Sequence, residues 1–307
     1  MAEIKASDVK QLREKTGAGM MDCKKALTEN NGDFEEAVTW LRKKGLAAAS
    51  KKAGRTASEG LVGFKIQGNL GVAVELNSET DFVARNDRFQ DLITGILDTA
   101  VIEKVSVEQM LSKKFMNGSL TVEQQITESV AIIGENMSLR RIDYAEVKNG
   151  AVIGYVHNAI DGNLGKIAVL VALESSANAE KLAEIGKKIA MHIAAMRPEV
   201  LDISDVNPEN VQKEKDIFAE QAAKSGKPSN IIEKMVEGRV SKYYEEIVLL
   251  EQFFVMDNKI KIRDYVAKEA KDLGSDIKLA SFVRYELGQG IEKQASNFEE
   301  EVKAMVK

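Results

Sequence analysis

Few side chains in this chain of 307 residues have types and spacings that suggest catalysis. Its two histidines, His157 and His192, have no serine, cysteine or carboxylate neighbour at a spacing that suggests a proton relay. Cys23 is the only cysteine, so a disulfide framework within one chain is excluded, and no Cys-x-x-Cys pair offers a zinc site. We therefore predict no catalytic residue, no metal site and no cofactor.

Two glycine-containing segments are candidates for phosphate binding, Gly68-Asn69-Leu70-Gly71 and Gly162-Asn163-Leu164-Gly165. Neither extends to Gly-x-Gly-x-x-Gly or to a loop that ends in Gly-Lys-Ser/Thr, which are the patterns that place backbone amides around a phosphate. Both are typical of hairpin turns. The chain has 48 acidic residues, so a pair such as Asp81 and Asp87 is a weak indication of acid–base catalysis.

The most unusual local segment is the polar run from Asn77 to Asp87, which contains Thr80-Asp81-Phe82-Val83. It follows a predicted strand and precedes a predicted helix, so Thr80–Val83 should lie in a surface connection, where functional residues concentrate. The alternative is purely structural: Thr80 or Asp81 caps the helix and Phe82 packs into the core as a hydrophobic staple. Local chemistry alone favours the structural alternative.

Composition limits the remaining functions. A net charge of -5 argues against nucleic acid as the main partner, because such binding usually requires a basic face. The N-terminus has no apolar stretch and no later run approaches the length of a membrane span, so we expect a soluble, cytoplasmic protein without a membrane partner. Residues 1–56 carry 12 basic and 8 acidic residues, hence +4 against -9 for the remainder. This asymmetry indicates either electrostatic steering towards a partner or an ordinary solvated surface.

The first 45 or so residues are predicted to form three short helices. Ser7 is expected to cap the first, which runs to Lys15, and Gly17 and Gly19 interrupt the pattern before a second helix over 21–29. A third helix begins near Phe34. The segment 47–58 has small and basic residues without an apolar stripe, which is typical of a linker.

A hairpin and a helix are predicted next, and the arrangement recurs about ninety residues later. Strands over 61–67 and 70–76 flank Gly68-Asn69, and a helix follows over 87–104. Val152-Ile153-Gly154-Tyr155 resembles Leu61-Val62-Gly63-Phe64, and each copy leads into an apolar strand and a helix. These matches indicate a duplicated unit.

The last third is predicted to be mainly helical. Apolar residues over 181–196 form a narrow seam, and Asn207-Pro208 begins a second helix that ends at 225–228. Two consecutive helices with seams suggest a projecting helical hairpin, which either packs on itself or joins two copies of the chain. A helix capped by Ser229, a helix over 262–273, a strand over 277–287 and a final helix complete the prediction.

Five runs of residues resemble bacterial elongation factor Ts, in the order in which that family has them, and the resemblance extends from the first helix to the last. They are LREKTGAGMMDCKKAL at 12–27, TDFVARN at 80–86, IGENMSLRR at 133–141, SGKP at 225–228 and EKMVEGR at 233–239. The resemblance implies a non-enzymatic translation factor that binds elongation factor Tu with GDP and promotes exchange of GDP for GTP.

The resemblance also implies site residues. The loop matching Thr80, Asp81, Phe82 and Val83 would enter beside the partner's nucleotide and disturb its magnesium ion. Further partner contacts are implied for Arg13, Met20, Met21, Ile133, Gly134 and His157. The hairpin between His157 and Gly165 looks longer than in many family members, which bears on the contact implied for His157. Ala168 replaces a glycine that is common in the strand that follows, which would alter packing there.

The implied fold is α+β, with a ubiquitin-associated-like three-helix domain, two related antiparallel-sheet-plus-helix subdomains and a coiled-coil insertion. The expected divisions are 1–56 for the three-helix domain and linker, 57–145 for the first subdomain, 146–180 and 229–290 for the second, 181–228 for the helical hairpin and 291–307 for a C-terminal helical module. The alternatives are a non-enzymatic adaptor and a carboxylate-based hydrolase or metal enzyme around Asp81.

Overall fold

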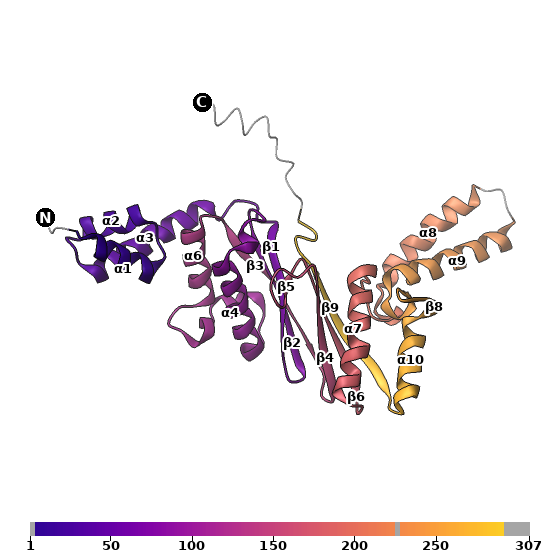
Figure 1. Cartoon of the computed structure of the whole chain (residues 1–307). Coiled ribbons are helices and arrows are strands. Elements are labelled where there is room, and N and C mark those ends of the chain that lie inside the picture. Colours follow the sequence, from indigo (N-terminus) through magenta and orange to yellow (C-terminus); the bar gives the residue numbers. More distant parts are fainter. Residues whose placement is uncertain (1–3, 225–227, 292–307) are drawn as a thin grey trace. The chain divides into compact units, whose positions relative to one another are not determined.

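The computed structural model describes residues 4–224 and 228–291 (Figure 1). These residues form two compact units, one from 4–63, 74–142 and 286–291, and the other from 64–73 and 143–285. Helices and antiparallel sheets are both present, so the chain is an α+β protein. The predicted C-terminal helix and the turn at 225–227 lie outside the described residues.

Three helices open the first unit: α1 (Ala6–Thr16), α2 (Met20–Glu29) and α3 (Phe34–Lys52). They enclose a small core that includes Leu12, Cys23 and Leu27. The predicted cap at Ser7 is wrong, because Lys5 occupies the N-cap position and the Ser7 hydroxyl bonds Asp8. Gly17 ends α1 in the left-handed conformation at φ 68°, which glycine adopts without steric cost.

The predicted linker over 47–58 is only partly correct. Helix α3 continues to Lys52, and only the segment from Ala53 to Ser58 is irregular. Alanine has the highest helix propensity, so Ala47–Ala49 extend the helix although they contribute no apolar stripe. The end of the apolar stripe therefore lies before the end of the helix.

A sheet follows the three helices and begins with the predicted hairpin, β1 (Glu59–Gln67) and β2 (Leu70–Ser78). With β3 (Met137–Glu146) and β5 (Leu164–Gly165) it forms a four-stranded sheet in the order β3-β2-β1-β5. Helix α4 (Asp87–Glu103) follows β2, as predicted, and buries Phe89, Ile93 and Ile96. Two further helices, α5 (Val107–Leu111) and α6 (Val122–Ile133), precede β3.

A buried carboxylate on β2 ties this sheet to the residues after the last strand. Glu75 has no exposed surface and accepts bonds from Arg140 at 3.1 Å, Arg141 at 2.5 Å and the Gly288 backbone N–H at 2.9 Å. Breaking such a pair leaves an uncompensated buried charge, which is costly. The cluster therefore fixes β2 and β3 relative to each other. In the chain, β2 precedes the candidate site and β3 follows it.

The second unit is built on a three-stranded sheet in the order β4-β6-β9, from β4 (Gly150–His157), β6 (Ile167–Ser175) and β9 (Ile277–Glu286). Strands β4 and β6 are antiparallel, with Gly150 opposite Glu174 and His157 opposite Ile167. The second Gly-Asn-Leu-Gly copy also contains a tight turn, as predicted, because Gly162 and Asn163 connect the antiparallel bridge between Asp161 and Leu164. It lies inside the longer connection from β4 to β6, which contains β5.

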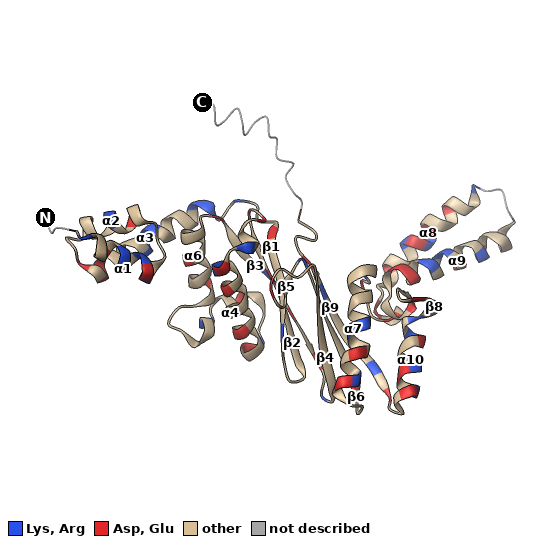
Figure 2. Cartoon of the chain, viewed as in Figure 1, with Lys and Arg blue, Asp and Glu red and all other residues tan. Residues whose placement is uncertain are grey.

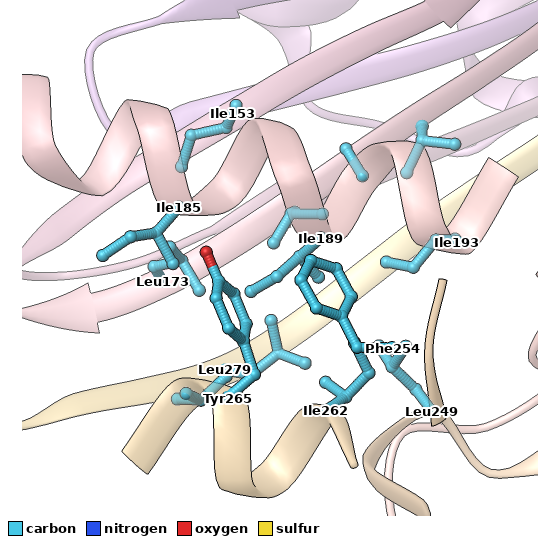
Figure 3. Close-up of a cluster of buried hydrophobic side chains, with 14 of the residues drawn as sticks. Ile153, Leu173, Ile185, Ile189, Ile193, Leu249, Phe254, Ile262, Tyr265 and Leu279 are labelled. Carbon is cyan, nitrogen blue, oxygen red and sulfur yellow. The ribbon is translucent and has the colours of Figure 1, made fainter. Parts of the chain in front are cut away.

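Helix α7 (Ala179–Met196) corrects the predicted helical hairpin. Its seam packs on β4 and β6, not on the next helix (Figure 1). Ile185, Ile189 and Ile193 face the side chains of Phe254 and Tyr265, whose rings stack with centroids 4.4 Å apart (Figure 3). A sheet face and a partner helix both select apolar residues at spacings of three and four, so the seam did not distinguish them.

The partner of α8 (Pro208–Ala223) is α9 (Ser229–Ile247), and the two share a small apolar core that includes Val211 and Val240. Asn207 caps α8 as predicted, accepting the Glu209 N–H at 2.9 Å. Ser229 does not cap α9; it is the first helical residue, and Pro228 holds the cap position.

Short strands β7 (Phe253–Phe254) and β8 (Asp257–Lys261) precede α10 (Ile262–Leu273), which has the predicted bounds. Charged residues are frequent on the helices, whereas β4 carries none and β2 and β6 carry one each (Figure 2). No helix in 4–224 or 228–291 is long and apolar enough to cross a membrane. The duplication of a hairpin and helix stays a prediction.

Candidate functional site

The candidate site is the connection between β2 and α4. Phe82 is 81% exposed and Asp81 is also exposed, whereas Val83 and Ala84 are buried at 4% and 1%. The structural alternative considered from the sequence is therefore wrong for Phe82, which does not enter the core. Nor do Thr80 or Asp81 cap α4, because the Asn86 side chain accepts the Arg88 N–H at 3.0 Å.

One end of the exposed segment is held by a carboxylate. Glu135 accepts the Thr80 backbone N–H at 2.9 Å through Oε2 and the Thr80 hydroxyl at 2.6 Å through Oε1. The Ser78 hydroxyl donates to the Thr80 carbonyl at 3.0 Å. Hydrogen bonds to an ionised acceptor are shorter and about twice as strong as neutral ones, so Thr80 has a fixed backbone orientation.

The other end is held by packing. Val83 begins a short 3-10 turn over Val83–Arg85, and the Gln90 side-chain amide donates to the Ala84 carbonyl at 3.0 Å. Asp81 and Phe82 consequently project between two anchored positions. An exposed aromatic side chain on an ordered backbone loses little conformational freedom on contact, because a phenyl ring has only two side-chain torsions to fix.

Ile133 and Gly134 directly precede Glu135 in the chain, and Glu135 bonds to Thr80 of this segment. Gly134 ends α6 at φ 91° and donates its N–H to the Val130 carbonyl at 3.0 Å. Its own carbonyl accepts a hydrogen bond from the Lys52 ammonium at 2.6 Å. Side chains other than glycine rarely adopt this φ. The structure thus brings together Thr80 and Ile133–Gly134, which are far apart in the sequence.

Arg13, Met20 and Met21 lie on the three-helix segment. Arg13 is exposed on α1, and Met20 and Met21, 43% and 76% exposed, form the start of α2. Both methionines are therefore surface residues, not core residues. Methionine is flexible and polarisable, which suits an adaptable contact surface.

The two histidines have different surroundings in the second unit. His157 is exposed at the end of β4, with Nδ1 3.0 Å from the Tyr155 hydroxyl. His192 is fully buried in α7, 2.9 Å from the Gln252 side-chain oxygen, and accepts the Val255 N–H at 3.1 Å. Burial lowers the pKa of His192 to about 4, partly offset by the bond to Gln252. His192 therefore has a structural role, joining α7 to the segment that contains Gln252 and Val255.

Three residues of the site were not singled out from the sequence: Glu79, Glu135 and Asn136. The signal was available, since Glu135-Asn136 directly follows the helix-ending Gly134 and Glu79 directly precedes Thr80. Pairing them required the tertiary structure, because more than fifty residues separate the two pairs. Within the described ranges, no group of three or more His, Cys, Asp or Glu residues is arranged to hold a metal ion.

Fold and site together define an α+β protein whose candidate site is an exposed, doubly anchored surface loop. The family model described as Elongation factor TS matches residues 79–289. A protein from Rhodospirillum centenum named elongation factor Ts is 56% identical over 305 residues, which cover 99% of each chain. Another of that name from Rhodospirillum rubrum is 55% identical over 308 residues, with both chains covered completely.

A third elongation factor Ts, from Rickettsia bellii, is 52% identical over 305 residues, 99% of this chain and 98% of its own length. The chain therefore belongs to the elongation factor Ts family. It is a translation elongation factor and takes part in protein biosynthesis, as the resemblance in the sequence implied.

Proposed function

We propose that this protein binds elongation factor Tu in its GDP form and accelerates the release of GDP, so that GTP can replace it. The observation that supports this most directly is the exposure of Phe82, at 81%, on a loop whose two ends are fixed. A solvent-exposed phenyl ring on an ordered backbone can enter a partner without unfolding either side. Family membership supports the same proposal.

The mechanism that we propose requires no covalent chemistry. Magnesium demands near-ideal octahedral coordination, so displacing the groups or waters around it weakens the nucleotide that it helps to hold. Phe82 would displace structure beside the partner's nucleotide, Asp81 would add a nearby negative charge, and Thr80 and Val83 would fix the loop that carries them. The chain itself would supply neither metal nor cofactor.

Reciprocity of coupling explains how the factor leaves its partner. If the bound factor lowers the affinity of the partner for nucleotide, nucleotide binding must lower the affinity for the factor by the same ratio. A new nucleotide would therefore displace the factor and allow another cycle. The chain would act as an exchange factor and not as an enzyme that makes or breaks bonds.

The remaining contact residues fall on three surfaces. Arg13, Met20 and Met21 would contact the partner's nucleotide-binding domain from the three-helix segment, and Ile133 and Gly134 would do so beside the loop. His157 would meet another domain of the partner. Its exposure supports this role, and the long connection from His157 to Ile167 is the part in which this chain could differ from its relatives.

The domain division remains a proposal for 1–56, 57–145 and 291–307, whereas the boundaries between 146–180, 181–228 and 229–290 do not hold for the helical hairpin. The packing of α7 on the β4-β6 sheet suggests that α8 and α9 are the helices of the projecting pair. Association of two copies through these helices also stays a proposal. Partners other than elongation factor Tu, such as nucleic acid or membrane, are not part of the proposed function.

Release of a fluorescent GDP analogue from elongation factor Tu tests the proposed function. Mixing the preformed complex with excess unlabelled GDP should give a slow fluorescence change that this chain accelerates, in proportion to its concentration until saturation. Omitting the chain gives the spontaneous rate. Equal rates with and without the chain, at concentrations where binding is shown independently, would contradict the proposal.

A further inference from the structure

Two dipeptides exchange carboxylate bonds beside the exposed loop. Glu135 accepts the Thr80 N–H at 2.9 Å, and Glu79 in turn accepts the Asn136 N–H at 2.6 Å. Each dipeptide therefore provides one carboxylate and one backbone N–H to the other. We call Glu79, Thr80, Glu135 and Asn136 the carboxylate clamp.

The clamp closes on a third segment as well. The Asn136 side-chain amide donates to the Arg55 carbonyl at 2.7 Å, and the Arg55 guanidinium lies 3.3 Å from Glu79. Asn136 is buried and Glu79 is partly shielded, with 20% of its side chain exposed. Partial exclusion of water strengthens charge-assisted bonds relative to exposed pairs. The end of β2 is thereby joined to the residues that follow α6 and α3.

Glu135 has a special position in the clamp because it binds Thr80 twice. One oxygen fixes the backbone N–H and the other fixes the hydroxyl, so both the position and the orientation of Thr80 are determined. Only Asp81 separates Thr80 from Phe82 in the chain. On the opposite side, Glu135 follows directly after Ile133-Gly134.

We propose that Glu135 is a positioning residue for nucleotide exchange, acting through Thr80 to hold Phe82 at a fixed distance from Ile133–Gly134. This inference rests on the proposed function, because it assumes that Phe82 is the group that disturbs the partner. In this role Glu135 would act through Thr80 and not by contact with the partner's nucleotide or magnesium. It keeps the backbone of the loop in the orientation required when the partner arrives, so less ordering remains to be done at binding.

Glu135→Gln is the sharpest test, because it retains the shape of the side chain but removes the charge and replaces one accepting oxygen with a donor. Stopped-flow release of a fluorescent GDP analogue, measured over a range of factor concentrations, separates the maximal rate from the half-saturating concentration. The maximal rate should fall about tenfold, corresponding to about 1.4 kcal/mol, and the half-saturating concentration should change less than threefold. Glu123→Gln, an exposed carboxylate on α6, is the matched control and should leave both unchanged.

Two variants of Thr80 test the route of the effect. Thr80→Ser keeps the donating hydroxyl and should retain most of the maximal rate, whereas Thr80→Val should lower it. Combining Thr80→Val with Glu135→Gln should cost less than the sum of the single changes, because both remove the same bond. Additive losses would contradict a route through Thr80.

Hydrogen exchange gives a readout that does not depend on the partner. The amides around Thr80 should exchange faster in Glu135→Gln, while those of α4 and β6 keep their protection, so global unfolding can be separated from loop release. If Phe82→Ala has no effect on GDP release, the proposed role of Phe82, on which this inference rests, fails. If Phe82→Ala lowers the maximal rate and Glu135→Gln does not, the proposed function stands and the positioning role of Glu135 is overturned.

Discussion

Phe82 exposes an apolar ring that contributes little to the stability of the free chain. Phe82→Ala should change the free energy of unfolding by less than about 0.5 kcal/mol, as for other surface changes. It should nevertheless slow stimulated GDP release by at least about tenfold, since well-packed aromatic contacts dominate many interfaces. Ile102→Ala, at an apolar residue of α4 that is 65% exposed, is the control and should leave the release rate unchanged. Unfolding curves and GDP release measured on the same preparations check both parts, and a fully active, folded Phe82→Ala would contradict the prediction.

His192 should make stability depend on pH. Burial lowers its pKa to about 4 in the folded protein, against 6.5 for the ordinary group, so the unfolded chain binds the proton first as the pH falls. The contribution of neutral His192 to the free energy of unfolding is complete above pH 6.5 and is lost as the pH falls from 6.5 to about 4. Its total is roughly 3 kcal/mol. Protonation would also place a hydrogen on Nδ1, which accepts the Val255 N–H.

Denaturant unfolding at pH 7.5 and pH 5 tests this assignment. The wild-type chain should lose more stability over that interval than His192→Gln, whose side chain does not titrate. His192→Gln should be less stable at pH 7.5, because the buried bonds to Gln252 and Val255 are disturbed. Equal losses in the two proteins would assign the pH dependence to other groups.

At the scale of elements, the β1-β2 hairpin carries the loop and contains two glycines with positive φ. Gly60 has φ 119°, and an added Cβ would lie 2.3 Å from the Leu76 carbonyl oxygen; Gly68 has φ 59° and nothing within 4 Å. Gly68→Ala should lower the free energy of unfolding by about 1–2 kcal/mol, because alanine is strained at this φ. Gly60→Ala should cost roughly 2–4 kcal/mol, because the backbone of β2 must also shift. Chemical unfolding followed by circular dichroism compares them, and equal costs would show that close packing at Gly60 is not limiting.

Most elements could be predicted from the sequence because their signals are local. Asn207-Pro208 begins α8, the bounds of α10 agree, and the Gly68-Asn69 turn joins the expected strands. The partner of α7 could not be predicted, because its apolar spacing suits a sheet as well as a helix. The exposure of Phe82 also required tertiary information, since Val83 and Ala84 fill the core position that the structural alternative assigns to Phe82. Only the family resemblance indicated a function for the loop.

At the scale of the whole molecule, the excess of positive charge in residues 1–56 is available to steer association. Lys24 and Lys43 are exposed on α2 and α3, and Lys213 and Lys268 are exposed on α8 and α10. If the basic segment guides encounter, Lys24→Gln with Lys43→Gln should lower the association rate constant for elongation factor Tu about threefold at low salt. The same number of changes at Lys213 and Lys268 should have a smaller effect.

Salt concentration provides the control for this comparison. The difference between the two double variants should disappear as ionic strength rises towards 1 M, where the screening length is about 3 Å. Stopped-flow association at several salt concentrations measures it. A difference that persists at high salt would indicate loss of a direct contact, and no difference at low salt would favour an ordinary solvated surface.

The two anchors of the loop have a consequence for how this segment can vary. Thr80 is fixed by Glu135, and Val83 and Ala84 are fixed in the core, so the number of residues between them determines the direction of the Phe82 ring. Inserting one residue before Phe82 would preserve every side chain of the site yet turn the ring away from its original direction. Mutational libraries that seek faster or slower variants of this protein should therefore vary side chains at constant loop length. Elsewhere on the surface, insertions between helices are a more tolerant source of diversity.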